Sequence, residues 1–192
     1  MAERRVLLVE DSLQRAGRTA MFRKEASLPA RLLVSKKLLN GRIFDWGCGR
    51  GRDVEYFVKS GFDAVGWDPV HFPGHKPWGI ENGLFQWVHC AFVINTLPFP
   101  SQRLNLIKEI YEFLPQEGHL ALATRSEYEI ESKRKPSWKK FSDGWITSRG
   151  TFTRGFDTDE ILSLVGTFFT DTRLLSSDPI LIAARKSRSS YR

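Results

Sequence analysis

One short segment constrains the fold of this chain more than any other part of its sequence. It has the order strand, glycine-rich loop, helix and strand, which is typical of a nucleotide-binding βαβ unit. Apolar residues at 43–44 and 65–67 predict the two strands, and residues 54–59 predict the helix between them. Asp45 and Asp68 end the two strands. In a Rossmann-type fold, the acidic residue after the second strand binds the ribose hydroxyl groups of a nucleotide.

The spacing of the glycines indicates which nucleotide this unit binds. A dinucleotide-binding loop has the pattern G-x-G-x-x-G, and its third glycine lets the helix pack closely on the strand. Here Arg52 stands at the position of that third glycine, and the glycines instead alternate at Gly47, Gly49 and Gly51. Alternating glycines allow positive φ angles and close approach of a ligand to the backbone. The amides that start the following helix favour a carboxylate. The pattern therefore argues against a dehydrogenase.

The pattern D-x-G-x-G-x-G resembles motif I of the class I S-adenosylmethionine-dependent methyltransferases. The resemblance implies a Rossmann-like, doubly wound, mostly parallel α/β sheet, with the loop around the methionine end of S-adenosylmethionine. An ordinary glycine-rich turn is the alternative, and the acidic end of the second strand argues against it. The resemblance and the strand ends assign the following residues to cofactor binding: Asp45, Gly47, Cys48, Gly49, Gly51, Asp53, Trp67, Asp68, Pro69 and Asn95.

Further segments resemble one group within this family, the methyltransferases associated with DNA phosphorothioation. These segments are Arg18–Lys24, Gly66–His71, Phe92–Asn95 and Asp143–Phe152, and the last of them, D-G-W-I-T-S-R-G-T-F, is the most specific. The resemblance to this group implies an association with modified DNA but names no substrate.

Length and composition favour one compact catalytic domain. The 192 residues, of which 41% are hydrophobic, are enough to bury one substantial core without disulfides or a structural metal. The two cysteines suggest no disulfide framework, and no signal peptide or membrane span is expected, so we predict a cytoplasmic protein. We expect an N-terminal leader and helix at 1–41 that pack on the cofactor side. The methyltransferase domain should span 42–185 with a basic insertion at 126–150, followed by a mobile basic tail at 186–192.

The order of the remaining elements supports a doubly wound sheet. Residues 69–83 hold three prolines and three glycines, and they predict a loop that replaces or shortens the third strand. The other predicted elements are a helix at 29–39, strands at 84–94 and 118–124, a helix at 101–114, a helix at 157–168 capped by Asp157 or Thr158, and paired strands at 171–175 and 180–185.

Asn95 is the candidate catalytic residue, because it ends the fourth strand of the standard fold. Ligands gather outside the carboxyl ends of parallel strands, so its side chain should lie beside the donor methyl group. Capping of the turn after the strand is the alternative role. The four histidines form no recognised metal spacing, so no metal is expected, and only His71 is a candidate for the cofactor mouth.

Charge suggests the partner. The net charge of +7 is partly gathered in the insertion, where aromatic residues alternate with the basic ones. Cations neutralise phosphates and aromatic rings stack on unpaired bases, which favours DNA or RNA. The predicted contact residues are Lys133, Arg134, Lys135, Trp138, Lys139, Lys140 and Arg149. A solvated basic loop is the alternative.

Three classes of function therefore remain open. The first is a methyltransferase that acts on a nucleic acid or a nucleotide-like molecule. The second is a methyltransferase that acts on a small molecule or a protein. The third is a non-catalytic module that binds S-adenosylmethionine and nucleic acid.

Overall fold

The computed structural model describes residues 23–75 and 84–187. Most of the predicted leader, including its signature up to residue 22, lies outside the described residues, as do 76–83 and 188–192. Six strands form one sheet in the order β2-β1-β3-β4-β9-β8. They are β1 (Ile43–Trp46), β2 (Ala64–Trp67), β3 (Trp87–Ala91), β4 (His119–Thr124), β8 (Thr170–Ser177) and β9 (Ile180–Arg185).

The sheet is mostly parallel. Strands β1, β2, β3 and β4 pair in parallel, whereas β9 pairs antiparallel with β4 and with β8. The predicted Rossmann-like α/β fold is therefore confirmed. Within the described part of 69–83, the only element is the short 3-10 helix η1 (Pro73–His75), and β2 forms the edge of the sheet. The prediction that the third strand is lacking holds for these residues.

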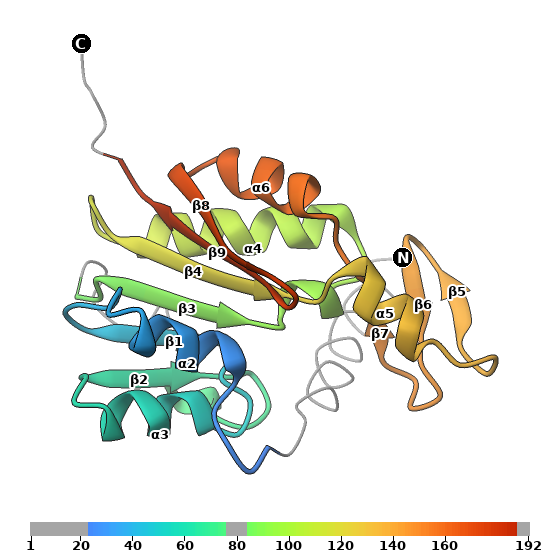
Figure 1. The fold of residues 1–192 in the computed structure, drawn as a ribbon, viewed down its shortest axis with the longest axis horizontal. Helices are drawn as coiled ribbons and strands as arrows, with labels where there is room; N and C mark the ends of the chain where they lie inside the picture. The colour runs from blue at the N-terminus through green and yellow to red at the C-terminus, as the bar shows by residue number, and fades with distance from the viewer. Residues whose placement is uncertain (1–22, 76–83, 188–192) are drawn as a thin grey trace.

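Helices cover both faces of the sheet (Figure 1). On one face lie α2 (Leu28–Ser35) and α3 (Arg52–Lys59), and on the other lie α4 (Pro100–Phe113) and α6 (Thr158–Gly166). Helix α6 begins as predicted, because the Asp157 carboxylate accepts a hydrogen bond from the amide of Thr158 at 2.6 Å. Helix α2 ends four residues earlier than the predicted residue 39, because Lys37 adopts a φ angle of +54° that a helix does not continue.

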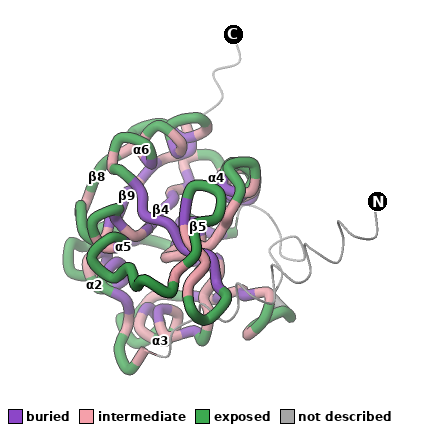
Figure 2. Tube along the Cα trace, turned by 90° about the vertical axis from the view of Figure 1, so that its right-hand side faces the viewer, coloured by how far each residue is buried: buried purple, intermediate pink, exposed green. Residues whose placement is uncertain are grey.

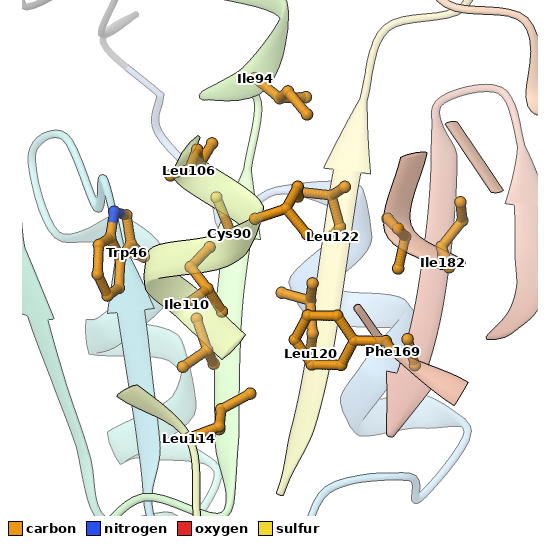
Figure 3. Close-up of a cluster of buried hydrophobic side chains, with 14 of the residues drawn as sticks. Trp46, Cys90, Ile94, Leu106, Ile110, Leu114, Leu120, Leu122, Phe169 and Ile182 are labelled. Atoms are coloured by element: carbon orange, nitrogen blue, oxygen red, sulfur yellow. The ribbon is translucent and has the colours of Figure 1, made fainter. Parts of the chain in front are cut away.

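The alternation of side chains along each strand divides the core into two layers. Figure 3 shows the layer under α4, where Leu106 and Ile110 of the helix face Leu120 and Leu122 of β4. Figure 2 shows the same arrangement from another side, with β4 buried in the centre and helices exposed around it. Each buried leucine or isoleucine contributes about 1.5–3 kcal/mol to the free energy of unfolding. None of the described helices has the length and apolar character needed to cross a membrane.

The basic insertion is more ordered than a loop. It contains α5 (Glu127–Lys133), β5 (Lys139–Phe141) and β6 (Gly144–Ile146), and β6 also pairs with β7 (Phe152–Thr153) to form a separate three-stranded sheet. Ser126 caps α5 by accepting a hydrogen bond from the amide of Glu129 at 3.0 Å. This small sheet lies beyond the carboxyl ends of the parallel strands (Figure 1), next to the expected cofactor site.

One predicted boundary is wrong. Lys186, which we expected to begin a mobile tail, is buried and belongs to the domain. Its ammonium group donates hydrogen bonds to the carbonyl oxygens of Tyr111 at 2.6 Å and Leu114 at 2.7 Å, near the end of α4. The amine also lies over the Tyr111 ring. A lysine that donates hydrogen bonds to the unpaired carbonyl oxygens at the end of a helix stabilises the fold, so Lys186 is not part of a basic tail.

Candidate functional site

The glycine loop after β1 has the backbone that its sequence predicts. Gly47, Gly49 and Gly51 have φ angles of +75°, +56° and +75°, which only glycine adopts freely. The amide of Gly47 donates a hydrogen bond to the carbonyl of Trp67 at 2.8 Å, so the loop is attached to the end of β2. A Cβ atom on Gly47 would stand 2.4 Å from Cγ2 of Val93. The loop therefore lies directly against the segment that follows β3.

Asp68 joins the loop to the turn after β2. One carboxylate oxygen accepts a hydrogen bond from the amide of Gly49 at 3.1 Å, and the other accepts from the amides of Val70 and His71, each at 2.9 Å. A carboxylate offers about four acceptor positions, so Asp68 can still accept from a ligand hydroxyl group. The His71 side chain is not among the described residues that line the cavity.

A large cavity opens between the glycine loop and the small sheet, with a volume of about 1350 Å³. Ligand pockets commonly measure about 300–1,000 Å³, so this one has room for a cofactor and part of an acceptor. The predicted cofactor residues that line it are Asp45, Gly47, Cys48, Gly49, Asp53, Trp67, Asp68, Pro69 and Asn95. Gly51 lies just behind the wall, where it caps α3. Cys48 is half-buried in the cavity wall, and burial raises the pKa of its thiol, which disfavours the reactive thiolate.

Two buried acids lie beneath the loop and have different partners. Asp45 contacts the Nδ1 atom of His89 through one oxygen at 2.9 Å. Asp53 accepts hydrogen bonds at both oxygens from Ser27, at 2.6 Å from its amide and 2.7 Å from its hydroxyl group. Arg23 lies 3.8 Å from the same carboxylate. Asp53 therefore joins the start of α3 to the start of α2, and its contact with the cofactor stays a prediction.

Three buried side chains of the site lie close enough together to be compared with a metal site. The ligand atoms of Asp45, Asp53 and His89 lie within 4.8 Å of one another. However, Asp45 and His89 are hydrogen-bonded to each other, and Ser27 occupies both oxygens of Asp53. These hydrogen bonds give each of the three side chains a partner within the protein. The absence of a metal stays a prediction.

Asn95 lies in the 3-10 helix η3 (Ile94–Thr96), four residues beyond the end of β3. The prediction that it directly ends a strand at 84–94 is wrong, because the strand stops at Ala91 and the next residue, Phe92, has a φ angle of +61°. The Asn95 side chain is buried in the cavity wall, and its Oδ1 atom has no hydrogen-bond partner among the described residues. An unpaired buried amide oxygen costs about 1–3 kcal/mol, which a ligand donor would recover. Its backbone oxygen accepts a hydrogen bond from the amide of Arg154 at 3.0 Å, so the segment that follows β7 holds the backbone of Asn95 in place.

Asp143 attaches the small sheet to the main domain. Arg103 of α4 donates to both carboxylate oxygens of Asp143, at 3.1 and 2.5 Å. Arg154 donates to Asp143 at 2.6 Å and to Glu160 of α6 at 2.6 Å. The next residue, Gly144, has no room for a side chain, because a Cβ atom would stand 2.5 Å from the Phe152 ring. The start of the D-G-W-I-T-S-R-G-T-F signature is therefore a structural attachment.

The middle of the signature is a tight loop between β6 and β7. The amide of Thr147 donates to the carbonyl of Thr151 at 2.8 Å, and the two threonine hydroxyl groups are hydrogen-bonded to each other at 2.8 Å. Gly150 closes the turn with a φ angle of +73°. The loop places Ser148 and Arg149 in the cavity wall opposite the cofactor residues. Arg149 is thus positioned by a rigid backbone.

The predicted basic contact residues divide into three groups. Lys133 and Arg134 line the cavity but already pair with acids on α5, Lys133 with Glu129 at 2.6 Å and Arg134 with Glu131 at 2.8 Å. Lys140 lies 4.7 Å from the centre of the Trp145 ring. The third group, Lys135, Lys139 and Arg149, has no carboxylate partner among the residues that the structure describes. Of this group, Lys135 and Arg149 line the cavity, as does Trp138.

Some residues of the wall carry little signal in the sequence. Phe92 has a φ angle of +61°, and its ring lies between the guanidinium groups of Arg23, at 5.0 Å, and Arg125, at 5.4 Å. Glu109 of α4 also lines the cavity, and burial, with Glu112 nearby, raises its pKa. Positive φ at a phenylalanine is strained and is common near functional sites. Phe92 stands in one of the segments that resemble the phosphorothioation-associated group, but the sequence gives no sign of its two arginine neighbours or of the position of Glu109 in the wall.

Comparison with known proteins assigns the family. A family model described as a methyltransferase domain matches residues 15–153. The chain therefore belongs to the methyltransferase domain family. With the parallel sheet and the D-x-G-x-G-x-G loop, this membership makes it a class I S-adenosylmethionine-dependent methyltransferase, as the sequence predicts. No curated protein matches the sequence.

Solved structures of low sequence identity share the fold. The sugar N-methyltransferase KedS8 from Streptoalloteichus sp ATCC 53650 has a TM-score of 0.63 at 12% identity, over 89% of this chain and 90% of its own. The 1,6-didemethyltoxoflavin-N1-methyltransferase of Burkholderia thailandensis was solved with S-adenosylhomocysteine. It has a TM-score of 0.60 at 16% identity, over 83% of this chain and 76% of its own. The amino pentose methyltransferase CalS10 from Micromonospora echinaspora was solved with S-adenosylmethionine. It has a TM-score of 0.55 at 14% identity, over 83% of this chain and 89% of its own.

The residues of the cavity fit this cofactor. The cofactor carries an ammonium group, a carboxylate and a ribose, and the wall offers a partner for each of them. Asp45 has a buried oxygen without a partner among the described residues, and Asp68 has acceptor capacity left. The glycine loop leads into α3, and amides at a helix start favour a carboxylate. The cofactor prediction is confirmed at the level of the family.

Proposed function

We propose that this methyltransferase transfers the methyl group of S-adenosylmethionine to a nucleic acid, DNA or RNA. One observation carries the proposal: the cavity that holds the cofactor residues at one end is bordered at the other by a basic and aromatic wall. That wall contains Lys135, Trp138 and Arg149. The cations of this wall would bind the phosphate backbone of the acceptor, while one of its bases enters the cavity and receives the methyl group. A nucleic-acid acceptor also agrees with the predicted cytoplasmic location and with the resemblance to methyltransferases associated with DNA phosphorothioation.

The chemistry requires alignment more than covalent catalysis. The cofactor supplies a methyl group that its sulfonium makes electrophilic. The glycine loop and Asp68 hold the donor side, and Asn95 offers its unpaired amide oxygen to an N–H or O–H donor of the acceptor. Accurate alignment of this kind is worth about 7–11 kcal/mol in well-oriented intramolecular reactions. The partly enclosed cavity also limits the access of competing water.

The charge of the acceptor wall supports a phosphate-bearing acceptor. Lys135, Lys139 and Arg149 lack carboxylate partners among the described residues, so each can pair with a phosphate without breaking an existing bond. Lys133 and Arg134 would first have to leave the glutamates of α5. Trp138 is only partly buried and can stack on an unpaired base, which is worth about 1–3 kcal/mol. We therefore expect a preference for single-stranded or locally opened nucleic acid.

A small-molecule acceptor is the second candidate. It is favoured by the size of the cavity, about 1350 Å³, and by the acceptors of the structural neighbours, which are 1,6-didemethyltoxoflavin, an amino pentose and a sugar. In that case the cations would bind a single phosphate or carboxylate of the acceptor. The two candidates differ in how strongly binding depends on salt and chain length.

The test is binding of single-stranded DNA and RNA across a range of salt concentrations. A triple variant, Lys135→Ala, Lys139→Ala and Arg149→Ala, removes the unpaired cations. A matched triple variant, Lys36→Ala, Lys59→Ala and Arg173→Ala, removes equal charge from exposed positions outside the cavity wall. Each lost phosphate contact lowers the log–log salt slope by about 0.7–0.9, so the first variant should lose about 2 to 3 and the second almost none.

The outcomes separate the candidates. Loss of slope in the cavity variant alone supports the nucleic-acid acceptor. Equal loss in both variants would indicate attraction to the overall charge of the protein, and absence of binding at low salt would leave the small-molecule candidate. Trp138→Ala should weaken single-stranded binding with the slope unchanged, because stacking releases no counterions.

A further inference from the structure

His89 is an unusual residue for its position. It lies in the middle of β3, a strand whose other side chains are apolar and whose residues are mostly buried. In the sheet it stands directly beside Asp45 of β1, and its Nδ1 atom contacts a carboxylate oxygen of Asp45 at 2.9 Å. The two side chains are only 1% and 3% exposed. A buried imidazole and carboxylate reduce stability compared with apolar residues of similar volume, which points to a role beyond packing.

Each partner of this pair keeps one atom free. The second oxygen of Asp45 and the Nε2 atom of His89 are buried and have no hydrogen-bond partner among the described residues. Asp45 also lines the cavity beside the glycine loop. The charged groups that act on the pair are Asp53, at the start of α3, and Arg23, before α2. Phe57 of α3 packs its ring edge-on to the imidazole at 5.2 Å, so water is excluded from this side.

The pair shares a proton. Burial raises the pKa of Asp45, because a charged carboxylate loses its hydration there. Burial acts to lower the pKa of His89, but the neighbouring Asp45 carboxylate outweighs this and raises it above its usual value. The hydrogen bond at 2.9 Å keeps one proton between Nδ1 of His89 and Asp45, a second proton on Nε2 makes the pair neutral, and the two groups titrate as a unit. Loss of the second proton leaves a net negative charge under the glycine loop and preserves the hydrogen bond.

We propose that His89 is a positioning residue for the cofactor: it holds Asp45 so that the free oxygen receives the ammonium group of the cofactor's methionine, and binding of that cation expels the second proton of the pair, the one on Nε2 of His89. The hydrogen bond through Nδ1 fixes the carboxylate throughout, and the second proton keeps the pair neutral before the cofactor binds. The arriving ammonium group takes over this neutralisation. The inference rests on the cofactor and is independent of the acceptor in the proposed function.

The sign of the pH dependence follows from this exchange. A cation beside the pair favours its deprotonated form, so the pair has a lower pKa in the complex than in the free protein. Cofactor affinity is then highest at pH values above the pKa of the free pair, and it falls as the pH decreases through that pKa. For one expelled proton the change is up to about tenfold for each pH unit.

Two ligands test the proposal on the wild-type protein. S-adenosylhomocysteine carries the ammonium group, and methylthioadenosine lacks the whole amino-acid part. Calorimetric titrations between about pH 5.5 and pH 8.5 should show affinity for S-adenosylhomocysteine rising with pH, with release of one proton detected by comparing buffers of different ionisation enthalpy. Methylthioadenosine should bind with nearly constant affinity. The same pH dependence for both ligands, or none for either, would overturn the proposal.

Variants separate positioning from packing. His89→Asn keeps an N–H donor near the Nδ1 position but cannot titrate, so it should bind S-adenosylhomocysteine with a flat pH profile and near wild-type affinity at high pH. His89→Leu removes the donor and should bind about tenfold or more weakly at all pH values. A wild-type pH profile in His89→Asn would refute the role. If both variants unfold, titration of the His89 ring by NMR in the wild type decides the question. Binding of S-adenosylhomocysteine must lower the pKa of His89, and an unchanged pKa would refute the proposal. A failed acceptor assay would leave these binding results unchanged.

Discussion

Replacement of Asp143 by asparagine should loosen the small sheet that forms the acceptor wall. The carboxylate is shared by Arg103 and Arg154, which are 4% and 9% exposed, while Asp143 itself is 38% exposed. The asparagine keeps the shape of the side chain and one acceptor oxygen but removes its charge. Both guanidinium groups then lose their common counter-ion, although Arg103 keeps the carbonyl of Leu97 and Arg154 keeps Glu160.

The expected loss of stability follows from these contacts. Removal of one partner from a fully buried ion pair costs about 3–5 kcal/mol. Water reaches the exposed side of Asp143 and the arginines keep other acceptors, so we expect a smaller cost of about 2 kcal/mol. For a domain of this size, that corresponds to a decrease of roughly 4–8 °C in melting temperature.

Urea unfolding is the assay, and Asp171→Asn is the matched control. Asp171 pairs with Arg185 at 2.5 Å on the surface, where the two side chains are 48% and 44% exposed, so its loss should cost under about 1 kcal/mol. Asparagine also tolerates the φ angle of +49° at this position. Equal urea midpoints of unfolding for the two variants would show that Asp143 stabilises the protein no more than a surface aspartate, and would refute its role in attaching the small sheet.

The attachment also predicts a pH dependence. Burial alone would raise the pKa of Asp143, but the hydrogen bond and charges of Arg103 and Arg154 lower it overall. The stability that Asp143 adds is therefore present above the pKa of an unfolded aspartate and is lost as the pH falls through the lower, folded value. The difference between wild type and Asp143→Asn should shrink in acid.

Three further variants test the cofactor side. Asp68→Ala should remove most of the increase in melting temperature that S-adenosylhomocysteine produces, because charge-assisted hydrogen bonds contribute about 1.5–3 kcal/mol each. If nicotinamide dinucleotides raised the melting temperature of the wild type to the same extent, that result would contradict the assignment of the cofactor site. Asn95→Ala should lower turnover while cofactor affinity stays nearly unchanged, and a parallel loss of affinity would indicate a structural role instead. Gly47→Ala should weaken both folding and cofactor binding, because its φ of +75° and the contact with Val93 exclude a Cβ atom, whereas Gly166→Ala meets nothing within 4 Å and should be tolerated.

Local patterns predicted the cofactor side of the molecule well. The alternation of Gly47, Gly49 and Gly51 allows positive φ angles, and the structure has them at all three residues. Asp157 was predicted as one of two possible caps and does begin α6. These features depend on residues close together in the chain, so the sequence carries them directly. The prolines and glycines after β2 likewise predict a loop there, and residues 69–75, the part of this segment that the structure describes, contain no strand.

Long-range partners were not predictable from one sequence. His89 looks like an ordinary strand residue until β3 lies beside β1 and brings it to Asp45, 44 residues away. Asp143 was noted as part of a signature, but its structural role depends on Arg103, 40 residues earlier. Lys186 appeared to begin a basic tail, because its carbonyl partners belong to a distant helix end. The charge of the insertion was visible, whereas its division into paired and unpaired cations required the fold.

The most direct test of the central claim is transfer of isotopically labelled methyl groups. The protein is incubated with labelled S-adenosylmethionine and, separately, with nucleic acid, protein and metabolite fractions of cells, with Asn95→Ala as the control. We predict label in the nucleic-acid fraction with the wild type and much less with the variant. Label only in the metabolite or protein fraction would contradict the proposed acceptor. No label in any fraction, despite binding of the cofactor, would contradict catalysis itself.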